Sequence, residues 1–93
     1  MNFSEQTQFS PSYETLLVEE DVKDIILYND DVNTFDFVID TLVELCGHDT
    51  LQAEQCAMLV HFKGKCAVKR GIYTELEPIC STMLNRGLTA EIE

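Results

Sequence analysis

Hydrophobic residues follow two different spacings along most of the chain. Short runs that are rich in β-branched residues, or that alternate between apolar and polar, predict strands, and apolar residues that recur every three or four positions predict helices. The predicted strands are 24–28, 66–73 and 88–93, and the predicted helices are 35–46, 50–63 and 75–86. The order β-α-α-β-α-β indicates an α+β fold, a two-layer sandwich in which three helices cover a three-stranded sheet.

Residues that begin and end helices flank each predicted helix. Side chains that accept hydrogen bonds precede the helices and glycines follow them, as expected for N-caps and C-caps. The capping residues are Thr34, Asp49 with Gln52, and Thr74 with Glu77, and the terminating glycines are Gly47, Gly64 and Gly87. Gly71 interrupts the second strand, where we expect a β-bulge.

The second predicted helix carries a broad apolar face that includes Leu51, Leu59 and Phe62. His61 lies within this apolar run, so it is either a satisfied core residue or a neutral ring that accepts a hydrogen bond from a ligand. His48 follows Gly47 in the loop between two helices, and we expect its side chain to be solvated.

Residues 1–22 differ from the rest of the chain because they show no sustained periodicity. We expect a flexible N-terminal arm over 1–22 and a folded domain over 23–93. The four cysteines contain no C-x-x-C pair and lie in apolar runs, which favours reduced, buried thiols in a cytoplasmic protein. No secretory signal and no apolar run of about 20 residues is visible, so neither secretion nor a membrane span is expected.

The chain is strongly acidic, with 17 acidic and 6 basic residues and a formal net charge of −11. This balance argues against nucleic acids and anionic membranes as partners, because both are bound mainly through Lys and Arg. Four of the basic residues lie between positions 63 and 70. They are interpreted as a solvated guard on an edge strand, or else as a contact for an acidic partner.

The segment Asn29-Asp30-Asp31 follows the first predicted strand and is typical of a polar turn. A calcium loop starting at Asp31 would need Gly at its sixth position and Glu at its twelfth, where Asp36 and Leu42 stand instead. No metal or cofactor is therefore expected. Carboxylate and amide oxygens also suit the three donors of an ammonium group, so a cationic ligand is the competing interpretation.

Motifs of nucleophilic, metal-dependent or nucleotide-dependent enzymes are absent from the sequence. A Cys–His nucleophile would need a spatial pairing that the sequence does not define. We therefore assign no catalytic residue and expect a protein that is not an enzyme.

Three blocks of the sequence resemble the ClpS family of protease adaptors. They are Asn29-Asp30-Asp31 followed by residues 33–38, Ala57–Phe62 followed by Gly64-Lys65, and Gly71–Thr74. The resemblance covers about residues 22–93. It implies an adaptor that binds substrates through a hydrophobic N-terminal residue (Leu, Phe, Tyr or Trp) and delivers them to the ClpA unfoldase of the ClpAP protease.

The resemblance also implies a set of site residues. The α-ammonium of the substrate would be held by Asn29, Asp30 and His61, with Asp31 orienting the loop. The side-chain pocket would be lined by Asn33, Phe35, Val38, Met58 and Leu88. Asn33-Thr34-Phe35 stands where many members have Thr-Pro-Met. The alternative interpretation is a protein-interaction module of the same fold that does not recognise N-terminal residues.

Overall fold

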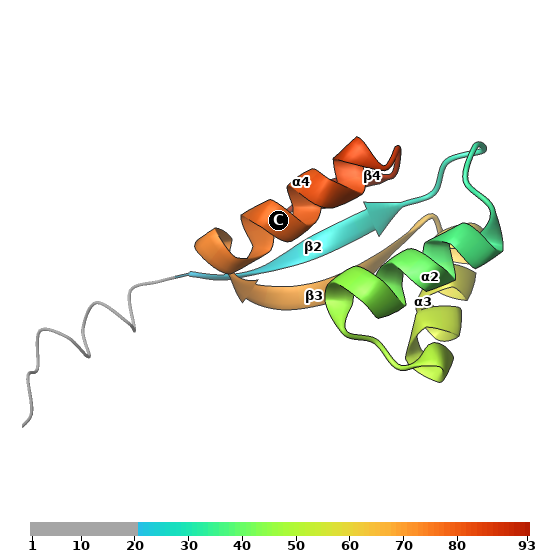
Figure 1. Cartoon of the computed structure of the whole chain (residues 1–93), viewed down its shortest axis with the longest axis horizontal. Helices are drawn as coiled ribbons and strands as arrows, with labels where there is room; N and C mark the ends of the chain where they lie inside the picture. Colours follow the sequence, from blue (N-terminus) through green and yellow to red (C-terminus); the bar gives the residue numbers. More distant parts are fainter. Residues whose placement is uncertain (1–20) are drawn as a thin grey trace, which may run out of the picture.

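The computed structural model describes residues 21–93, which form three strands and three helices around one core (Figure 1). The elements in chain order are β2 (Val22–Tyr28), α2 (Phe35–Cys46), α3 (Thr50–Lys63), β3 (Lys65–Ile72), α4 (Tyr73–Asn85) and β4 (Thr89–Ile92). This arrangement confirms the predicted α+β fold and its β-α-α-β-α-β order. The expected N-terminal arm lies outside the described residues, except for Asp21 and Val22.

The sheet is antiparallel, with β2 between β3 and β4. Ile25 and Leu27 on the central strand point to the same face, where they are fully buried against Leu42 of α2 and Leu76 of α4. Because alternate residues of a strand share a face, this one row of β2 side chains forms the base of the core. All three helices contribute to that core, which gives the two-layer arrangement seen in Figure 1.

Local sequence sets the ends of α2 and α3 as predicted. The Thr34 hydroxyl accepts a hydrogen bond from the Phe37 amide at 3.1 Å, and the Asp49 carboxylate accepts one from the Gln52 amide at 2.7 Å. Gly47 and Gly64 end these helices with φ angles of 73° and 97°, a left-handed conformation that favours glycine.

The predicted cap of the third helix is wrong. Helix α4 begins at Tyr73, directly after β3, and its N-cap is Ile72, which makes no side-chain capping bond. Thr74 and Glu77 therefore lie inside the helix rather than at its boundary. The chain passes from strand to helix without a loop, so the position of the first turn is set by the packing of β3 and α4 and not by a capping side chain.

The strand irregularity is also displaced from its predicted position. Gly71 pairs regularly with Lys23, whereas the β2–β3 register shifts between Ile25 and Ile26, opposite Lys69 and Ala67. The extra residue is Val68, which is buried in the core. A Cβ atom on Gly71 would lie 3.0 Å from the Glu75 carboxylate and 3.5 Å from Leu76, so Gly71 permits a close approach of β3 to α4.

His48 is buried, contrary to the expectation of a solvated side chain. Its Nε2 donates a hydrogen bond to the Val68 carbonyl oxygen at 2.6 Å, and only 6% of the residue is exposed. The bulge leaves that carbonyl available, and the loop after α2 folds inward to satisfy it.

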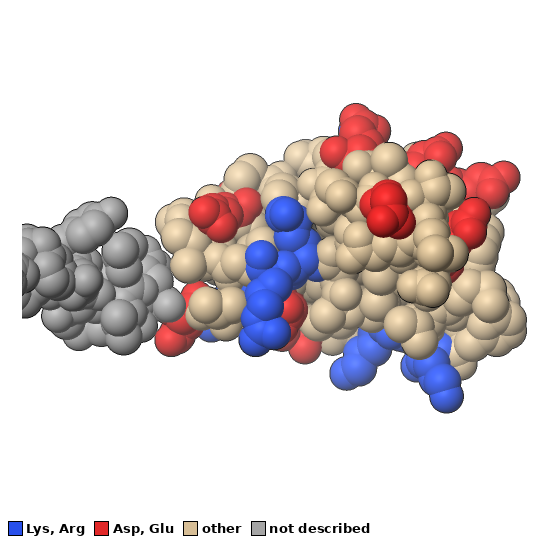
Figure 2. Space-filling view, turned by 90° about the horizontal axis from the view of Figure 1, so that it is seen from below, with Lys and Arg blue, Asp and Glu red and all other residues tan. Residues whose placement is uncertain are grey.

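Three of the four basic residues predicted for an edge strand lie on one. Lys65, Lys69 and Arg70 belong to β3, which is at one edge of the sheet, and Lys63 is the last residue of α3. Figure 2 shows basic side chains near the centre and along the lower edge of this view, whereas many acidic side chains lie at the upper right and a few lie beside the basic ones at the lower left. Within residues 21–93, no helix combines the length and apolar character needed to cross a bilayer.

Candidate functional site

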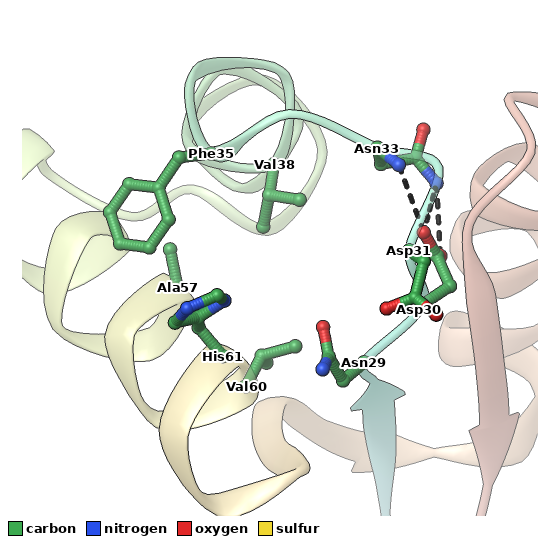
Figure 3. A pocket seen from close by; sticks show the side chains of 9 residues that line it. All are labelled: Asn29, Asp30, Asp31, Asn33, Phe35, Val38, Ala57, Val60 and His61. Atoms are coloured by element: carbon green, nitrogen blue, oxygen red, sulfur yellow. Dashed lines mark hydrogen bonds between the residues drawn. The ribbon is translucent and has the colours of Figure 1, made fainter.

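A pocket of about 300 Å³ opens at the C-terminal end of β2 (Figure 3). The loop after β2, the first turn of α2 and the second half of α3 form its walls. Its lining residues are Asn29, Asp30, Asp31, Asn33, Phe35, Val38, Ala57, Val60 and His61. The pocket thus combines a rim of amide and carboxylate oxygens with walls of apolar side chains.

Asp30 organises the polar rim. Its Oδ1 accepts hydrogen bonds from the backbone amides of Val32 and Asn33 at 3.0 and 2.9 Å, and both carboxylate oxygens accept from the Asn33 side-chain amide. The loop-orienting role expected of Asp31 therefore belongs to Asp30. Only one of these bonds reaches Oδ2, at 2.9 Å, so this oxygen retains capacity for a further donor.

The same hydrogen bonds keep Asp30 ionised. Partial burial raises the pKa of its carboxyl, but the bonds from Asn33 and Val32 outweigh that effect, so the pKa lies below its ordinary value. Asp30 is a carboxylate at neutral pH. The rim therefore carries a fixed negative charge that suits a cationic group.

Two further bonds hold the rim in place. The Asn33 side-chain amide donates to the carbonyl oxygen of Gly87 at 2.9 Å, which ties the loop to the turn between α4 and β4. The Asn29 backbone amide donates to the Gly64 carbonyl oxygen at 2.9 Å, which ties the loop to the end of α3. Among residues 21–93, the Asn29 side chain has no hydrogen-bond partner, and it points toward the pocket in Figure 3.

The opposite side of the pocket is apolar and aromatic. Val38 of α2 and Val60 of α3 form its inner walls, and the Phe35 ring packs edge-on against the His61 ring with centroids 6.2 Å apart (Figure 3). His61 is exposed on α3, which excludes the first of its two sequence interpretations, a satisfied core residue. Its ring faces the pocket from the side opposite Asp30.

The structure brings together most of the residues predicted from the sequence. Asn29, Asp30, Asn33, Phe35, Val38 and His61 all line the pocket. Leu88 is buried beside a small adjoining cavity of about 20 Å³, which shares Asn29, Asp30, Asn33, Val38 and Val60 with the pocket. Met58 does not line the pocket, because the helical rotation turns it to the outer face of α3, where it is 49% exposed.

Two apolar lining residues were missed by the sequence analysis. Ala57 and Val60 precede His61 by four residues and by one, and Ala57 lies one helical turn before it on the same face. The four-residue spacing from His61 could have identified Ala57, but it would not have excluded Met58, which precedes His61 by three residues. Val60 gave no such signal, because a valine at that position is also typical of a core residue.

The cysteines do not form a nucleophilic site. All four are free, with Cys66 half-buried and the others buried. Burial raises the pKa of the Cys46 thiol to about 11, and burial raises that of Cys66 to about 12. A thiol needs a lowered pKa to be a strong nucleophile at neutral pH, so these environments oppose such a role.

Within residues 21–93, no three His, Cys, Asp or Glu side chains are grouped to hold a metal ion.

Comparison with known families specifies the class of protein to which this fold and pocket belong. The family model described as "ATP-dependent Clp protease adaptor protein ClpS" matches residues 18–91. The chain therefore belongs to the ClpS family. This membership confirms the resemblance found in the sequence, and the name of the family describes an adaptor of the ATP-dependent Clp protease.

Curated relatives support the same conclusion. The chain is 40% identical to the ATP-dependent Clp protease adapter protein ClpS of Sodalis glossinidius over 67 aligned positions, which cover 62% of this chain and 61% of that protein. It is 36% identical, with the same coverage, to the proteins of that name from Salmonella arizonae and Salmonella newport. The chain thus matches about three-fifths of the length of these relatives.

Proposed function

We propose that this protein binds other proteins through a hydrophobic N-terminal residue and presents them to the unfoldase of an ATP-dependent Clp protease. The observation that supports the proposal most strongly is the composition of the pocket. Acceptor oxygens line one side and apolar side chains line the other, within a single cavity of about 300 Å³. Only the first residue of a chain offers an ammonium group next to its own side chain.

Each part of the terminus has a matching part of the pocket. The α-ammonium would donate to the side chains of Asn29 and Asp30 and to the neutral ring of His61. The side chain of the first residue would lie against Phe35, Val38 and Val60. An α-amino group has a pKa of about 7.7–8.0, so it is largely cationic at neutral pH and complements the Asp30 carboxylate.

Binding energies of the two parts are of similar size. A charge-assisted hydrogen bond contributes roughly 1.5–3 kcal/mol, and burial of a large apolar side chain contributes about 1.5–3 kcal/mol. Their sum of roughly 3–6 kcal/mol lies below the ~8.2 kcal/mol of a micromolar complex even before the cost of association, so additional hydrogen bonds of the ammonium and contacts of the following residues would have to contribute. Neither part alone suffices, so the pocket would select for an N-terminal residue that is also hydrophobic.

The partner that receives the substrate is proposed to be an AAA+ unfoldase of the ClpA type, and the place of action the cytoplasm. This part rests on the family name, which specifies an adaptor of the ATP-dependent Clp protease. The acidic, exposed first turns of α4, with Glu75 and Glu77, contain no lysine, so a docking surface there would require a basic partner.

A peptide series that varies only in its first residue tests the proposal. We expect peptides that begin with Leu, Phe, Tyr or Trp to bind at least tenfold more tightly than peptides that begin with Ser or Asp, because only the former fill the apolar part of the pocket. Fluorescence anisotropy with labelled peptides measures this difference. Equal affinity across the series would favour the alternative, an interaction module without N-terminal recognition.

A further inference from the structure

A row of apolar side chains on the outer face of α3 has no partner within residues 21–93. Met58 follows Leu51 by seven residues, and Phe62 follows Met58 by four. This spacing places all three side chains on one side of the helix. Their exposed fractions are 63%, 49% and 69%, whereas the core-facing residues of the same helix are buried. A cluster of large exposed apolar residues of this kind indicates an interaction surface.

This surface is continuous with the pocket. The His61 ring lines the pocket, and the Phe62 ring packs edge-on against it at a centroid distance of 4.7 Å and an angle of 86°. His61 also packs edge-on against Phe35, with ring centroids 6.2 Å apart. Three aromatic rings therefore lead from the mouth of the pocket onto the outer face of α3. We call Met58 and Phe62 the α3 ledge.

The charge of the pocket rim determines the side from which a bound chain leaves. The acceptors Asn29 and Asp30 attract the α-ammonium to one side of the pocket (Figure 3). At the tetrahedral Cα atom, the side chain points into the pocket and the carbonyl group points away from the ammonium. The chain then continues past the His61 ring, one nitrogen of which accepts from the ammonium and which packs against Phe62, and so reaches the α3 ledge.

Side-chain alternation in an extended chain identifies which residue meets the ledge. The first and third side chains point to the same face and the second points away, and two residues advance by about 6.6–6.8 Å. This advance is enough to cross the His61 ring, whose centroid lies 4.7 Å from that of Phe62. We propose that the α3 ledge binds an apolar side chain at the third position of the substrate, while the second position faces solvent. This inference rests on the proposed function.

Peptides that differ only at the second and third positions test the proposal. With leucine at the first position, phenylalanine at the third position should bind roughly fivefold more tightly than alanine there, because the ledge buries part of the added ring. Phenylalanine at the second position should give no such gain. Isothermal titration or anisotropy measures all three affinities.

Two variants separate the ledge from the pocket. Phe62→Ser should abolish the gain from phenylalanine at the third position, while affinity for the peptide with alanine there stays within about twofold of the wild-type value. Leu84→Ser is the matched control, because Leu84 is similarly exposed, at 52%, but belongs to α4. It should leave every affinity unchanged.

Several outcomes would overturn the proposal. One is an equal gain from phenylalanine at the second position, and another is a gain that persists in Phe62→Ser. If Phe62→Ser instead changes self-association in sedimentation and leaves the peptide affinities unaltered, the surface binds a second copy of this chain. If the wild-type protein binds none of the leucine-initiated peptides, the proposed function fails first, and the ledge proposal fails with it.

Discussion

Asp30→Ala is expected to weaken the binding of a leucine-initiated peptide by roughly a hundredfold. The substitution removes a charge-assisted bond worth about 1.5–3 kcal/mol, and it also releases the loop that carries the other acceptors. In the folded protein this carboxylate accepts bonds from Val32 and from Asn33, and Asn33 in turn contacts Gly87. Isothermal titration of both proteins with the same peptide measures the loss.

Asn29→Ala is the companion variant that separates the two causes. The Asn29 backbone amide bonds to Gly64 and is retained, while its side chain makes no bond within the described part of the chain. Loss of this acceptor should lower peptide affinity by about tenfold and leave the thermal midpoint unchanged. The proposed contacts of Asn29 and Asp30 with the ammonium are wrong under two joint results. Asp30→Ala lowers peptide affinity only because part of the protein is unfolded, and Asn29→Ala leaves peptide affinity unchanged.

The low pKa of Asp30 also sets the pH range of its contribution. Its folded-state pKa lies below the ordinary value of 3.8, so its favourable contribution is complete above that value and is lost as the pH falls through the folded-state pKa. Peptide binding should therefore gain no pH dependence from Asp30 between pH 7 and pH 5.

Leu42→Ala is expected to lower the free energy of unfolding by about 2–5 kcal/mol, which is a large share of the stability of so small a domain. Leu42 of α2 is completely buried in the core. Val43→Ala is the matched control, because the neighbouring side chain is 40% exposed and should contribute less than about 1 kcal/mol. Urea denaturation measures both values, and equal losses would contradict the described core.

The sequence predicted those features that depend on local chemistry. Thr34, Asp49 and Gly47 act within one turn of a helix, and their patterns located α2 and α3 closely. The polar segment Asn29-Asp30-Asp31 was identified for the same reason, because its amide and carboxylate acceptors suit an ammonium group as well as a turn.

The errors occurred where packing between distant elements decides the structure. His48 is buried because the β3 bulge presents the Val68 carbonyl oxygen, which no local pattern indicates. Thr74 does not cap α4 because that helix follows β3 without a loop. The sequence placed Phe62 among buried residues, since helical periodicity identifies apolar positions but does not distinguish a core from a binding surface.

The measurement that tests the account most directly compares one leucine-initiated peptide with its N-acetylated form. Acetylation removes the positive charge and leaves the leucine side chain intact, so it isolates the contribution of the rim formed by Asn29, Asp30 and His61. We expect the free peptide to bind at least thirtyfold more tightly, because acetylation removes both a charge-assisted hydrogen bond and the positive charge that complements the Asp30 carboxylate. Equal affinities for the two peptides would contradict the claim that this pocket recognises the beginning of a chain.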